Sequence, residues 1–338
     1  MKIGFLNTNF YNIPFKFNKG ITPSIARVSF AGSGDTFEKT TPQEDKRVAD
    51  EAKKNISTVK PWAKRLSNDA DAAFKIFKTK MENVFSNVCN SRDREFDWIP
   101  EETAKGELVT NKKSLTSIIE KMLSGGKKTE KEARAAIQDT IRARVVLKNG
   151  TQAEGDAICN EIMKAVKKNK LEIKEIRNYT TGDDMQYVSQ KAIRKLEKAI
   201  DETYGKNSYT SYKKTKNTGY NALHIIFKID NEFNGELQIM GKNVEKLKDV
   251  EDVFYKLKHN KHVSKKYDEI KKKYNSLYAK KQNAFVEELE AYIRDAYLLE
   301  RKKELGLIKY KDRFLPLNTN KYDLPKEFDF NYIASIKD

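Results

Sequence analysis

The runs ALHIIFKI (residues 222–229) and GELQIM (residues 235–240) decide the fold. Both are rich in β-branched and aliphatic residues, as strands are, and Asn234 and Gly235 form a turn signal between them. We therefore expect strands at 221–229 and 235–240 that pair as a β-hairpin.

One face of this hairpin is predicted to be polar. Side chains along a strand alternate between the two faces, so Leu223 and every second residue up to Ile229 belong to the core face. His224 then points to the opposite face, and Glu236 and Gln238 share a parity that can join it there. The expected face gathers an imidazole, a carboxylate and an amide, and these groups suit nucleotide chemistry.

The residues just before the first strand add an aromatic ring and a cation. Gly219 permits a tight turn that would hold the ring of Tyr220 as a stacking platform, which is how proteins commonly grip a nucleobase. Lys216 supplies a positive charge nearby. Each residue taken alone has a plainer interpretation, a half-buried core ring for Tyr220 and a satisfied polar sheet residue for His224.

The chain before the hairpin alternates helices and strands. Apolar residues at steps of three and four predict a helix at 61–89, and a shorter helix begins at Ser114 and ends before Gly125. A strand, a helix, a strand and a helix are then expected, in this order, at 140–147, 152–168, 171–177 and 188–204. The predicted class is α/β (α+β), with a mixed β-sheet flanked by helices and a helical C-terminal extension.

Four segments are expected along the chain. Residues 1–50 mix seven aromatic residues in the first forty positions with Asn, Gly and Pro, which predicts a loosely ordered leader. A docking or self-blocking segment is the alternative for this leader. Residues 51–241 form the domain that contains the hairpin, 242–305 a basic helical extension and 306–338 a tail.

The 338 residues carry a formal net charge of +17. A positive potential favours polyanionic substrates or partners, although a lysine-rich surface explains the charge equally well. The two cysteines, Cys89 and Cys159, form neither a disulfide framework nor a zinc spacing and are expected to be ordinary thiols. Because no run of 18 apolar residues occurs and residues 1–20 lack a secretory signal, we expect a cytoplasmic protein with no membrane partner.

A candidate phosphate grip precedes the strand that is expected at 140–147. Lys113, Ser117 and Lys121 are four residues apart, so a helix places them in one polar stripe. Lys112 and Lys113 also stand just before the helix N-terminus, where the helix dipole disfavours a cation unless an anion binds there. The pattern predicts a polyphosphate site, and a solvated lysine face is the alternative.

A candidate metal ligand stands at the start of the strand at 140–147. A carboxylate at a strand edge, here Asp139, suits Mg²⁺, which takes one or two such ligands together with substrate phosphates. Arg142 and Arg144 share a face of the strand and could stack on a base or bind phosphate. Regular alternation puts Asp139 and Arg144 on opposite faces, so either a β-bulge or a position of Asp139 outside the regular strand is needed to bring both to one site.

In these four places the chain resembles the synthetase domain of the RelA/SpoT family of nucleotide pyrophosphokinases, which make the alarmone (p)ppGpp. The resemblance covers about residues 61–255, and the motifs come in the family's order. Residues 113–121 (KSLTSIIEK) resemble R-x-K-S-x-x-S-I-x-x-K, and residues 139–144 (DTIRAR) resemble D-x-x-G-x-R. Residues 216–224 (KNTGYNALH) resemble K-x-N-G-Y-R-S-L-H, and residues 236–238 (ELQ) resemble E-x-Q.

The resemblance implies a role for each motif. The implied catalytic residues are Glu236, Asp139 and His224, and the implied Mg²⁺ ligands are Asp139 and Glu236. Arg144 would stack on adenine, and Tyr220 on the acceptor base. The full set of implied substrate-binding residues is Lys113, Ser117, Lys121, Arg142, Arg144, Lys216, Tyr220 and Gln238.

The implied reaction is a Mg²⁺-dependent transfer of pyrophosphate from ATP to the 3′-hydroxyl of a guanine nucleotide. Several residues depart from the family pattern. Asn111 stands where the first motif has arginine, and Arg142 replaces the glycine of the second. Thr218, Asn221 and Ala222 replace Asn, Arg and Ser in the third motif, and Met240 and Gly241 replace the Arg-Thr that follows E-x-Q. The family's hydrolase activity is not expected, because its metal site needs upstream histidines and all three histidines lie at or after position 224.

Two alternatives stay open. A toxin-like pyrophosphokinase would keep the reaction but act on the tRNA 3′ CCA end or on adenine nucleotides. The 13 lysines against six acidic residues at 241–281 suit RNA phosphates. A degenerate synthetase fold would serve only as an RNA- or partner-binding module. The expected partners are therefore ATP, a nucleotide acceptor or tRNA, and an antitoxin or a second copy of the chain.

Overall fold

The computed structural model describes residues 42–92, 102–124, 129–135, 137, 139–216, 218–248, 251 and 282–308, with some side chains near helix ends excepted. The chain divides into two compact units, Met1–Arg47 and Val48–Asp338, and the whole sheet lies in the second. Most of the predicted leader and tail lie outside the described residues. So do His259, His262 and the lysines at 265–273.

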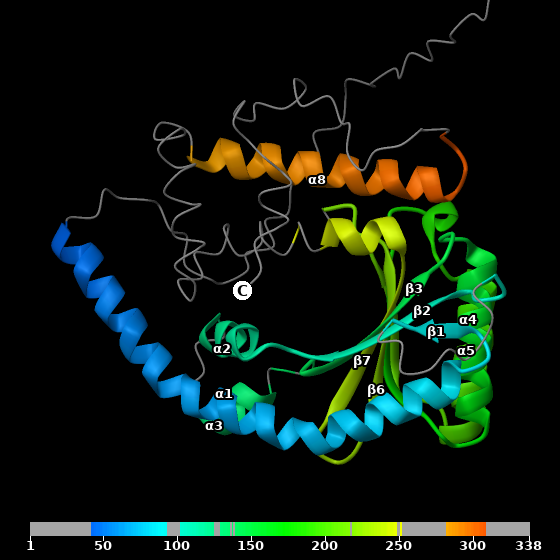
Figure 1. Ribbon diagram of the computed structural model, residues 1–338, viewed down its shortest axis with the longest axis horizontal. Coiled ribbons are helices and arrows are strands. Elements are labelled where there is room, and N and C mark those ends of the chain that lie inside the picture. The colour runs from blue at the N-terminus through cyan, green and yellow to red at the C-terminus, as the bar shows by residue number, and fades with distance from the viewer. Residues whose placement is uncertain are drawn as a thin grey trace, which may run out of the picture. The chain divides into compact units, whose positions relative to one another are not determined.

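A seven-stranded mixed sheet forms the centre of the second unit (Figure 1). Its strands follow the order β1 (Cys89–Ser91), β2 (Gly106–Lys112), β3 (Ile141–Leu147), β7 (Asn234–Gly241), β6 (Ala222–Lys228), β4 (Glu172–Tyr179) and β5 (Thr210–Lys214). The pairs β1 with β2, β3 with β7 and β4 with β5 are parallel, and the other neighbours are antiparallel. The predicted class, a mixed β-sheet flanked by helices, is confirmed at this level.

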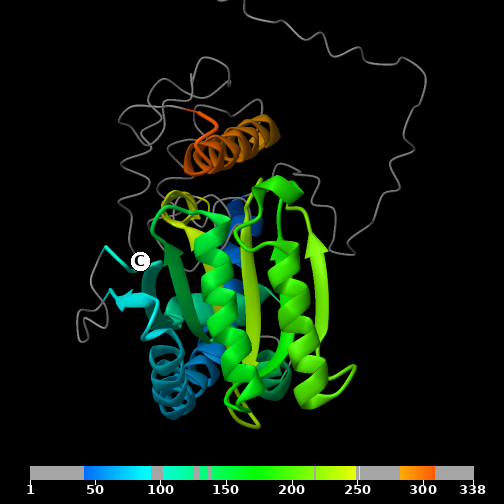
Figure 2. The same ribbon diagram turned by 90° about the vertical axis from the view of Figure 1, so that its right-hand side faces the viewer.

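Helices flank this sheet. Their bounds are α1 (Pro42–Phe85), α2 (Leu115–Ser124), α3 (Glu130–Ala135), α4 (Gln152–Lys167), the 3₁₀ turn η1 (Asp183–Met185), α5 (Gln190–Tyr204) and α8 (Gln282–Glu304), and residues 242–248 are also helical. Figure 2 shows α4 and α5 side by side over one face of the sheet. In the described part of the chain no helix is both long and apolar enough to cross a membrane.

The apolar core lies between the sheet and these helices. Ile158 of α4, Leu196 of α5 and Ile225 of β6 are fully buried in one cluster, and each such side chain contributes about 1.5–3 kcal/mol on burial. Thr151 and Glu154 form a capping box that fixes the start of α4. Because alternate residues of a strand face opposite ways, this core leaves the polar side chains of the central strands on the other face.

Most predicted elements are confirmed with closely matching bounds. The expected strands at 140–147 and 171–177 are β3 and β4, and the expected helices at 152–168 and 188–204 are α4 and α5. The helix expected at 61–89 is longer, since α1 begins at Pro42 and contains Pro61, a residue type that usually marks a helix boundary. β1, β2, β5 and α3 were not predicted, because they are short or polar.

The turn of the hairpin differs from its sequence signal. Asn234 and Gly235 belong to β7, and the turn is closed by Asp230, whose Oδ1 accepts from two backbone N–H groups of the turn. Gly235 is needed for close packing, since a Cβ there would lie 2.4 Å from Cε2 of Phe77 on α1. The predicted turn at Asn234 and Gly235 is therefore wrong, while the hairpin is confirmed.

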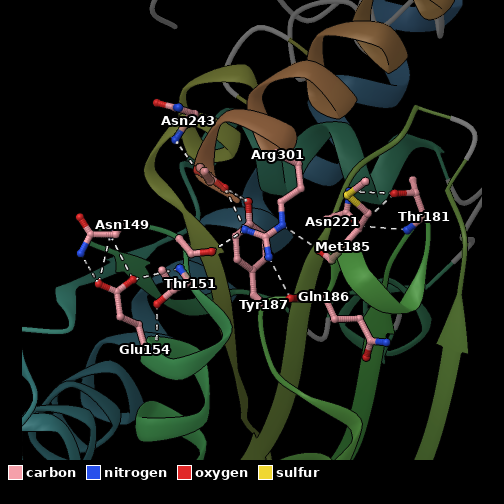
Figure 3. A network of polar contacts seen from close by, with 12 residues as sticks. Asn149, Thr151, Glu154, Thr181, Met185, Gln186, Tyr187, Asn221, Asn243 and Arg301 are labelled. Atoms are coloured by element: carbon pink, nitrogen blue, oxygen red, sulfur yellow. Dashed lines mark hydrogen bonds and ion pairs between the residues drawn. The ribbon is translucent and has the colours of Figure 1, made fainter. Parts of the chain in front are cut away.

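A buried arginine fixes α8 to the loops at one end of the sheet (Figure 3). Arg301 is fully buried and donates from Nε to the carbonyl of Met185 at 2.8 Å and from Nη2 to that of Gln186 at 2.9 Å. Glu304, one turn later, accepts from the hydroxyl of Tyr187 at 2.6 Å. A buried guanidinium is costly unless its N–H groups are bonded, so these contacts define where α8 docks.

Candidate active site

Polar side chains of three neighbouring strands share the face away from the core. In the register, Arg142 of β3 lies beside Glu236 of β7, and Arg144 lies beside Gln238. Gln238 also lies beside His224 of β6, as the sequence alternation predicts. The strand pairing therefore brings together residues from three of the four sequence motifs.

Glu236 is an ionised carboxylate at the centre of this face. It is 5% exposed, its Oε1 lies 2.9 Å from Nδ1 of His224, and its Oε2 accepts from Nε2 of Gln238 at 2.8 Å. Burial alone raises the pKa of a carboxyl group, but the hydrogen bonds from His224 and Gln238 outweigh it and lower the pKa of Glu236. The group stays charged at neutral pH and is a poor proton acceptor.

His224 is held between Glu236 and Tyr220. Its Nδ1 faces Glu236, and its Nε2 lies 2.9 Å from the hydroxyl of Tyr220. Burial lowers the pKa of His224 and outweighs the opposing effect of Glu236. A neutral ring protonated at Nδ1 satisfies both contacts, because it donates to Glu236 and accepts from Tyr220.

Tyr220 does not offer the open ring expected of a stacking platform. It is 1% exposed, the ring of Tyr297 from α8 packs edge-on at a centroid distance of 5.8 Å, and the Lys216 ammonium lies 4.7 Å from its centroid. Gly219, with a φ of +75°, makes the predicted tight turn, which directs the ring into the core. In this structure the ring of Tyr220 is therefore not open for a base to stack on, and its hydroxyl contacts His224.

A second carboxylate, Asp139, lies before β3 and outside the regular strand, which is one of the two arrangements that the strand alternation allows. Its Oδ2 accepts from Nζ of Lys113 at 2.8 Å, and its Oδ1 accepts from Nζ of Lys121 at 2.7 Å. Burial opposes ionisation of Asp139, but the two ammonium groups hold its pKa well below its usual range. Both lysines of the predicted phosphate grip thus contact the predicted metal ligand.

Lys113 is the more buried of these two lysines. Its side chain is 8% exposed, against 41% for Lys121. Burial lowers the pKa of Lys113 to about 8, with Lys121 and Arg142 adding to the shift and Asp139 opposing it. Ser117 lies in the first turn of α2, on the same helix as Lys121. A polyanion would stabilise such crowded cations.

The two carboxylate clusters are within electrostatic reach of each other. The negative charge of Asp139 raises the pKa of Glu236, although other effects lower it more. The positive charge of Arg142 lowers the pKa of Lys113. The Nε of Arg142 is buried and has no hydrogen-bond partner among the described residues. An anionic ligand would stabilise this unpartnered N–H, because an unmade buried hydrogen bond is costly.

Arg144 faces a carboxylate that the sequence argument missed. Its Nε donates to Oε1 of Gln238 at 3.3 Å, and its Nη1 lies 3.7 Å from Oε1 of Glu245. Glu245, from the helical residues 242–248, also accepts two hydrogen bonds of 2.9 Å from Arg92. No sequence motif identifies Arg92 as a neighbour of the site. The one signal for Glu245 is its position about one helical turn after β7, the strand that carries Gln238.

Magnesium fits this donor set only together with ligand oxygens. Among the described residues there is no group of three or more His, Cys, Asp and Glu side chains that could bind a metal ion. Mg²⁺ is commonly held by one or two carboxylates plus substrate phosphates and water, and Asp139 and Glu236 supply two. The ammonium groups of Lys113 and Lys121 would have to turn away from Asp139 before it could bind the ion.

Cys89 and Cys159 are buried thiols in no disulfide bond, as the sequence predicts. Burial raises the pKa of both, that of Cys159 to about 12. A thiol is reactive as its thiolate, so neither residue contributes a nucleophile at neutral pH.

No protein-family model matches this chain, and no curated protein or solved structure does either. The seven-stranded sheet with flanking helices defines a mixed α/β class. An assignment of function therefore depends on the sequence motifs and on the geometry in which their residues meet.

Proposed function

We propose that the protein is a transferase that moves phosphate groups from a nucleotide. The observation that carries this proposal is the convergence of Lys113, Lys121, Asp139, Arg142 and Glu236, which come from distant segments, on one side of the sheet. Cations beside two ionised carboxylates suit a phosphate chain that brings a divalent cation with it. Magnesium, when bound, supplies positive charge at the phosphate oxygens.

Within this class we infer a pyrophosphokinase with a RelA/SpoT-type synthetase fold, which transfers pyrophosphate from ATP to a guanine nucleotide and so makes (p)ppGpp. The acceptor 3′-oxygen bonds to the β-phosphorus of ATP. The bond from that phosphorus to the oxygen that bridges to the α-phosphorus breaks, AMP leaves, and the hydroxyl proton passes to solvent. The four RelA/SpoT-like motifs support this inference.

The lysine cluster would bind the phosphates of ATP. Lys113 and Lys121 both neutralise Asp139, and a triphosphate carries more negative charge than one carboxylate. When the ammonium groups turn to the phosphates, the oxygens of Asp139 become accessible to a metal ion. Ser117, in the first turn of α2, would add a hydroxyl donor for a phosphate oxygen.

Glu236 would act on the acceptor hydroxyl without keeping its proton. A general base works best with a pKa near the working pH, whereas the pKa of Glu236 is lowered by the hydrogen bonds that it accepts. This favours a metal ligand or a hydrogen-bond acceptor that orients the hydroxyl. His224 and Gln238 hold both carboxylate oxygens in place, so they are positioning residues for Glu236.

A label-transfer assay tests the proposal. Purified protein is incubated with Mg²⁺, ATP labelled at the γ-phosphate and, in separate reactions, GDP, GTP, AMP, ADP and deacylated tRNA, with the Glu236→Gln variant as control. We expect label on a guanine nucleotide. Label on an adenine nucleotide or tRNA would keep the reaction and change the acceptor, as in a toxin-like enzyme that needs an antitoxin. Absence of any glutamate-dependent transfer would reject the proposal in favour of a binding module.

A further inference from the structure

The polar face continues beyond the Glu236–His224 pair to the edge of the sheet. In the register, Arg177 of β4 lies beside His224, and Tyr212 of β5 lies beside Arg177. Lys214 lies beside Tyr179 in the same two strands. Side chains that are paired in this way share a face, so an aromatic and cationic surface adjoins the candidate active site.

The inner part of this surface contacts His224 directly. The ring of Tyr179 packs edge-on against His224 at a centroid distance of 4.8 Å, and the Lys216 ammonium lies 4.6 Å from the centroid of Tyr179. Arg177 donates from Nη2 to Glu175, while its Nε is buried and has no hydrogen-bond partner within the described part of the chain. A ligand oxygen would satisfy that N–H, and an anionic one would do so most strongly.

The outer part of the surface presents an accessible ring. Tyr212 is 40% exposed and is the one aromatic residue among the exposed large hydrophobic residues that the structure describes. It lies on β5, a strand in which every residue is exposed. Burial raises the pKa of Tyr212 to about 12, with Arg177 opposing the shift and Glu175 adding to it, which marks the three groups as electrostatic neighbours.

We propose that Arg177, Tyr212 and Lys214 form the subsite that binds the acceptor, with a nucleobase stacked on Tyr212 and its phosphate bound by Arg177 and Lys214. Tyr220 cannot take the base while it is 1% exposed, whereas Tyr212 is 40% exposed and lies on the same face of the sheet. The role of the bound nucleotide as the acceptor rests on the proposed function. Binding of a nucleotide to the subsite does not, since a ring beside cations is a common site for a base and its phosphate.

The dimensions of the sheet agree with this arrangement. Tyr212 stands two strand spacings, about 10 Å, from His224, which is comparable to the length of one nucleotide. The donor residues lie on the other side of His224, on β3 and at the start of α2. A nucleotide on β4 and β5 would therefore extend toward Glu236 from the side opposite to ATP. A free nucleoside diphosphate and the 3′ end of an RNA share this chemistry.

Binding titrations with matched variants test the subsite. The full-length protein is titrated calorimetrically with GDP and, separately, with a short RNA that ends in CCA. The variants Tyr212→Ala and Lys214→Ala should each weaken binding of whichever of the two ligands the wild type binds. We expect a loss of about 10-fold in affinity, because one stacking contact or one charged hydrogen bond contributes about that much. Tyr212→Phe keeps the ring, and Lys213→Ala removes a lysine from the opposite face of the same strand, so both should stay within about 2-fold of the wild type.

The outcomes separate the subsite from the reaction. Equal weakening by Lys213→Ala and Lys214→Ala, unchanged binding in Tyr212→Ala, or binding of neither ligand by the wild type would overturn the subsite. If the expected pattern of binding appears without any label transfer, the subsite stands and the proposed reaction fails. Melting curves followed by circular dichroism confirm that each variant is folded.

Discussion

Two carboxylates of the candidate site, Asp139 and Glu236, each meet two nitrogen groups, and their surroundings differ. Asp139 precedes β3 and meets the ammonium groups of two lysines, of which Lys121 is 41% exposed. Glu236 lies in the centre of the sheet and meets an imidazole and an amide whose positions are fixed by strand register. Ammonium groups on long stems can move to another anion, whereas paired strand residues cannot move without breaking the register.

The difference assigns a separate task to each cluster. The Asp139 cluster can exchange its ion pairs for contacts with phosphate when a ligand arrives, so it is expected to change on binding. The Glu236 cluster is pre-organised, so its carboxylate is expected to keep the same partners when a ligand binds. Substitutions in the two clusters should therefore fail in different ways.

The largest effect is expected from Glu236→Gln. Loss of the fixed charge should lower kcat/KM for label transfer by about 10³-fold, because removal of one pre-organised electrostatic group costs about 10²–10³. The control is Glu232→Gln, which removes a carboxylate from the exposed turn of the same hairpin and should leave the rate unchanged. The account of the fixed cluster fails if the Glu236→Gln enzyme keeps a tenth of the wild-type rate.

A smaller loss, about 100-fold in kcat/KM, is expected from Asp139→Asn, within the range for loss of one electrostatic group. The variant should lose its dependence on Mg²⁺ yet bind metal-free ATP at least as well, since the two lysines no longer neutralise a carboxylate. The control is Asp71→Asn, because Asp71 lies on α1, where it pairs with Lys112 of β2, and is outside the candidate site. An unchanged magnesium titration in Asp139→Asn would contradict a metal-binding role.

The third prediction concerns pH. Lys113 has a pKa lowered from 10.5 to about 8, so its charge is lost as the pH rises through 8, and affinity for an ATP analogue should fall about 10-fold by pH 9.5. The Lys113→Arg variant stays charged and should show a flatter profile. In the same comparison Lys112→Arg serves as control. Equal pH profiles in wild type and Lys113→Arg would remove Lys113 from the donor site.

The same shift has a consequence for stability. The folded protein binds fewer protons at Lys113 than the unfolded chain does between pH 8 and 10.5. The contribution of this group to the free energy of unfolding therefore rises across that window and is lowest below pH 8. Bound ATP should raise the pKa again, so that binding near pH 9 takes up protons.

The smallest effect is expected from Glu245→Gln. Glu245 lies 3.7 Å from Arg144, and loss of its charge should let that guanidinium move away from Gln238. We expect KM for ATP to rise about 3-fold with kcat unchanged, the size of a partly exposed ion pair. Glu107→Gln is the matched control, because Glu107 bonds the same Arg92 without touching Arg144. A change in kcat alone would contradict this positioning role.

The sequence was sufficient to predict the polar face of the hairpin. The alternation around Leu223 assigns His224 to the face away from the core, and the pairing of β6 with β7 confirms that Gln238 shares it. The alternation also predicted that Asp139 joins the site only through a bulge or from outside the strand, and the structure shows the second arrangement. These successes depend on a strand period of two, which is a local property of the chain.

The environment of Tyr220 could not be read from the sequence. Tyr297, which packs against Tyr220, lies 77 residues later in the chain. The helix that carries it, α8, is held in place by hydrogen bonds from Arg301 to backbone carbonyls, and no sequence motif predicts such bonds. For the same reason Glu245 and Arg92 were missed as neighbours of the site. Contacts between distant elements depend on how helices dock, and local periodicity carries no information about docking.

The most direct test of the central claim is the identity of the nucleotide that leaves ATP. The products of a reaction with ATP, Mg²⁺ and the best acceptor are separated by ion-exchange chromatography and counted. The account predicts one AMP for each acceptor that gains two phosphates, and no AMP in the Glu236→Gln reaction. Production of ADP in its place, or of AMP at equal rates in both proteins, would contradict a pyrophosphoryl transfer that depends on the fixed carboxylate.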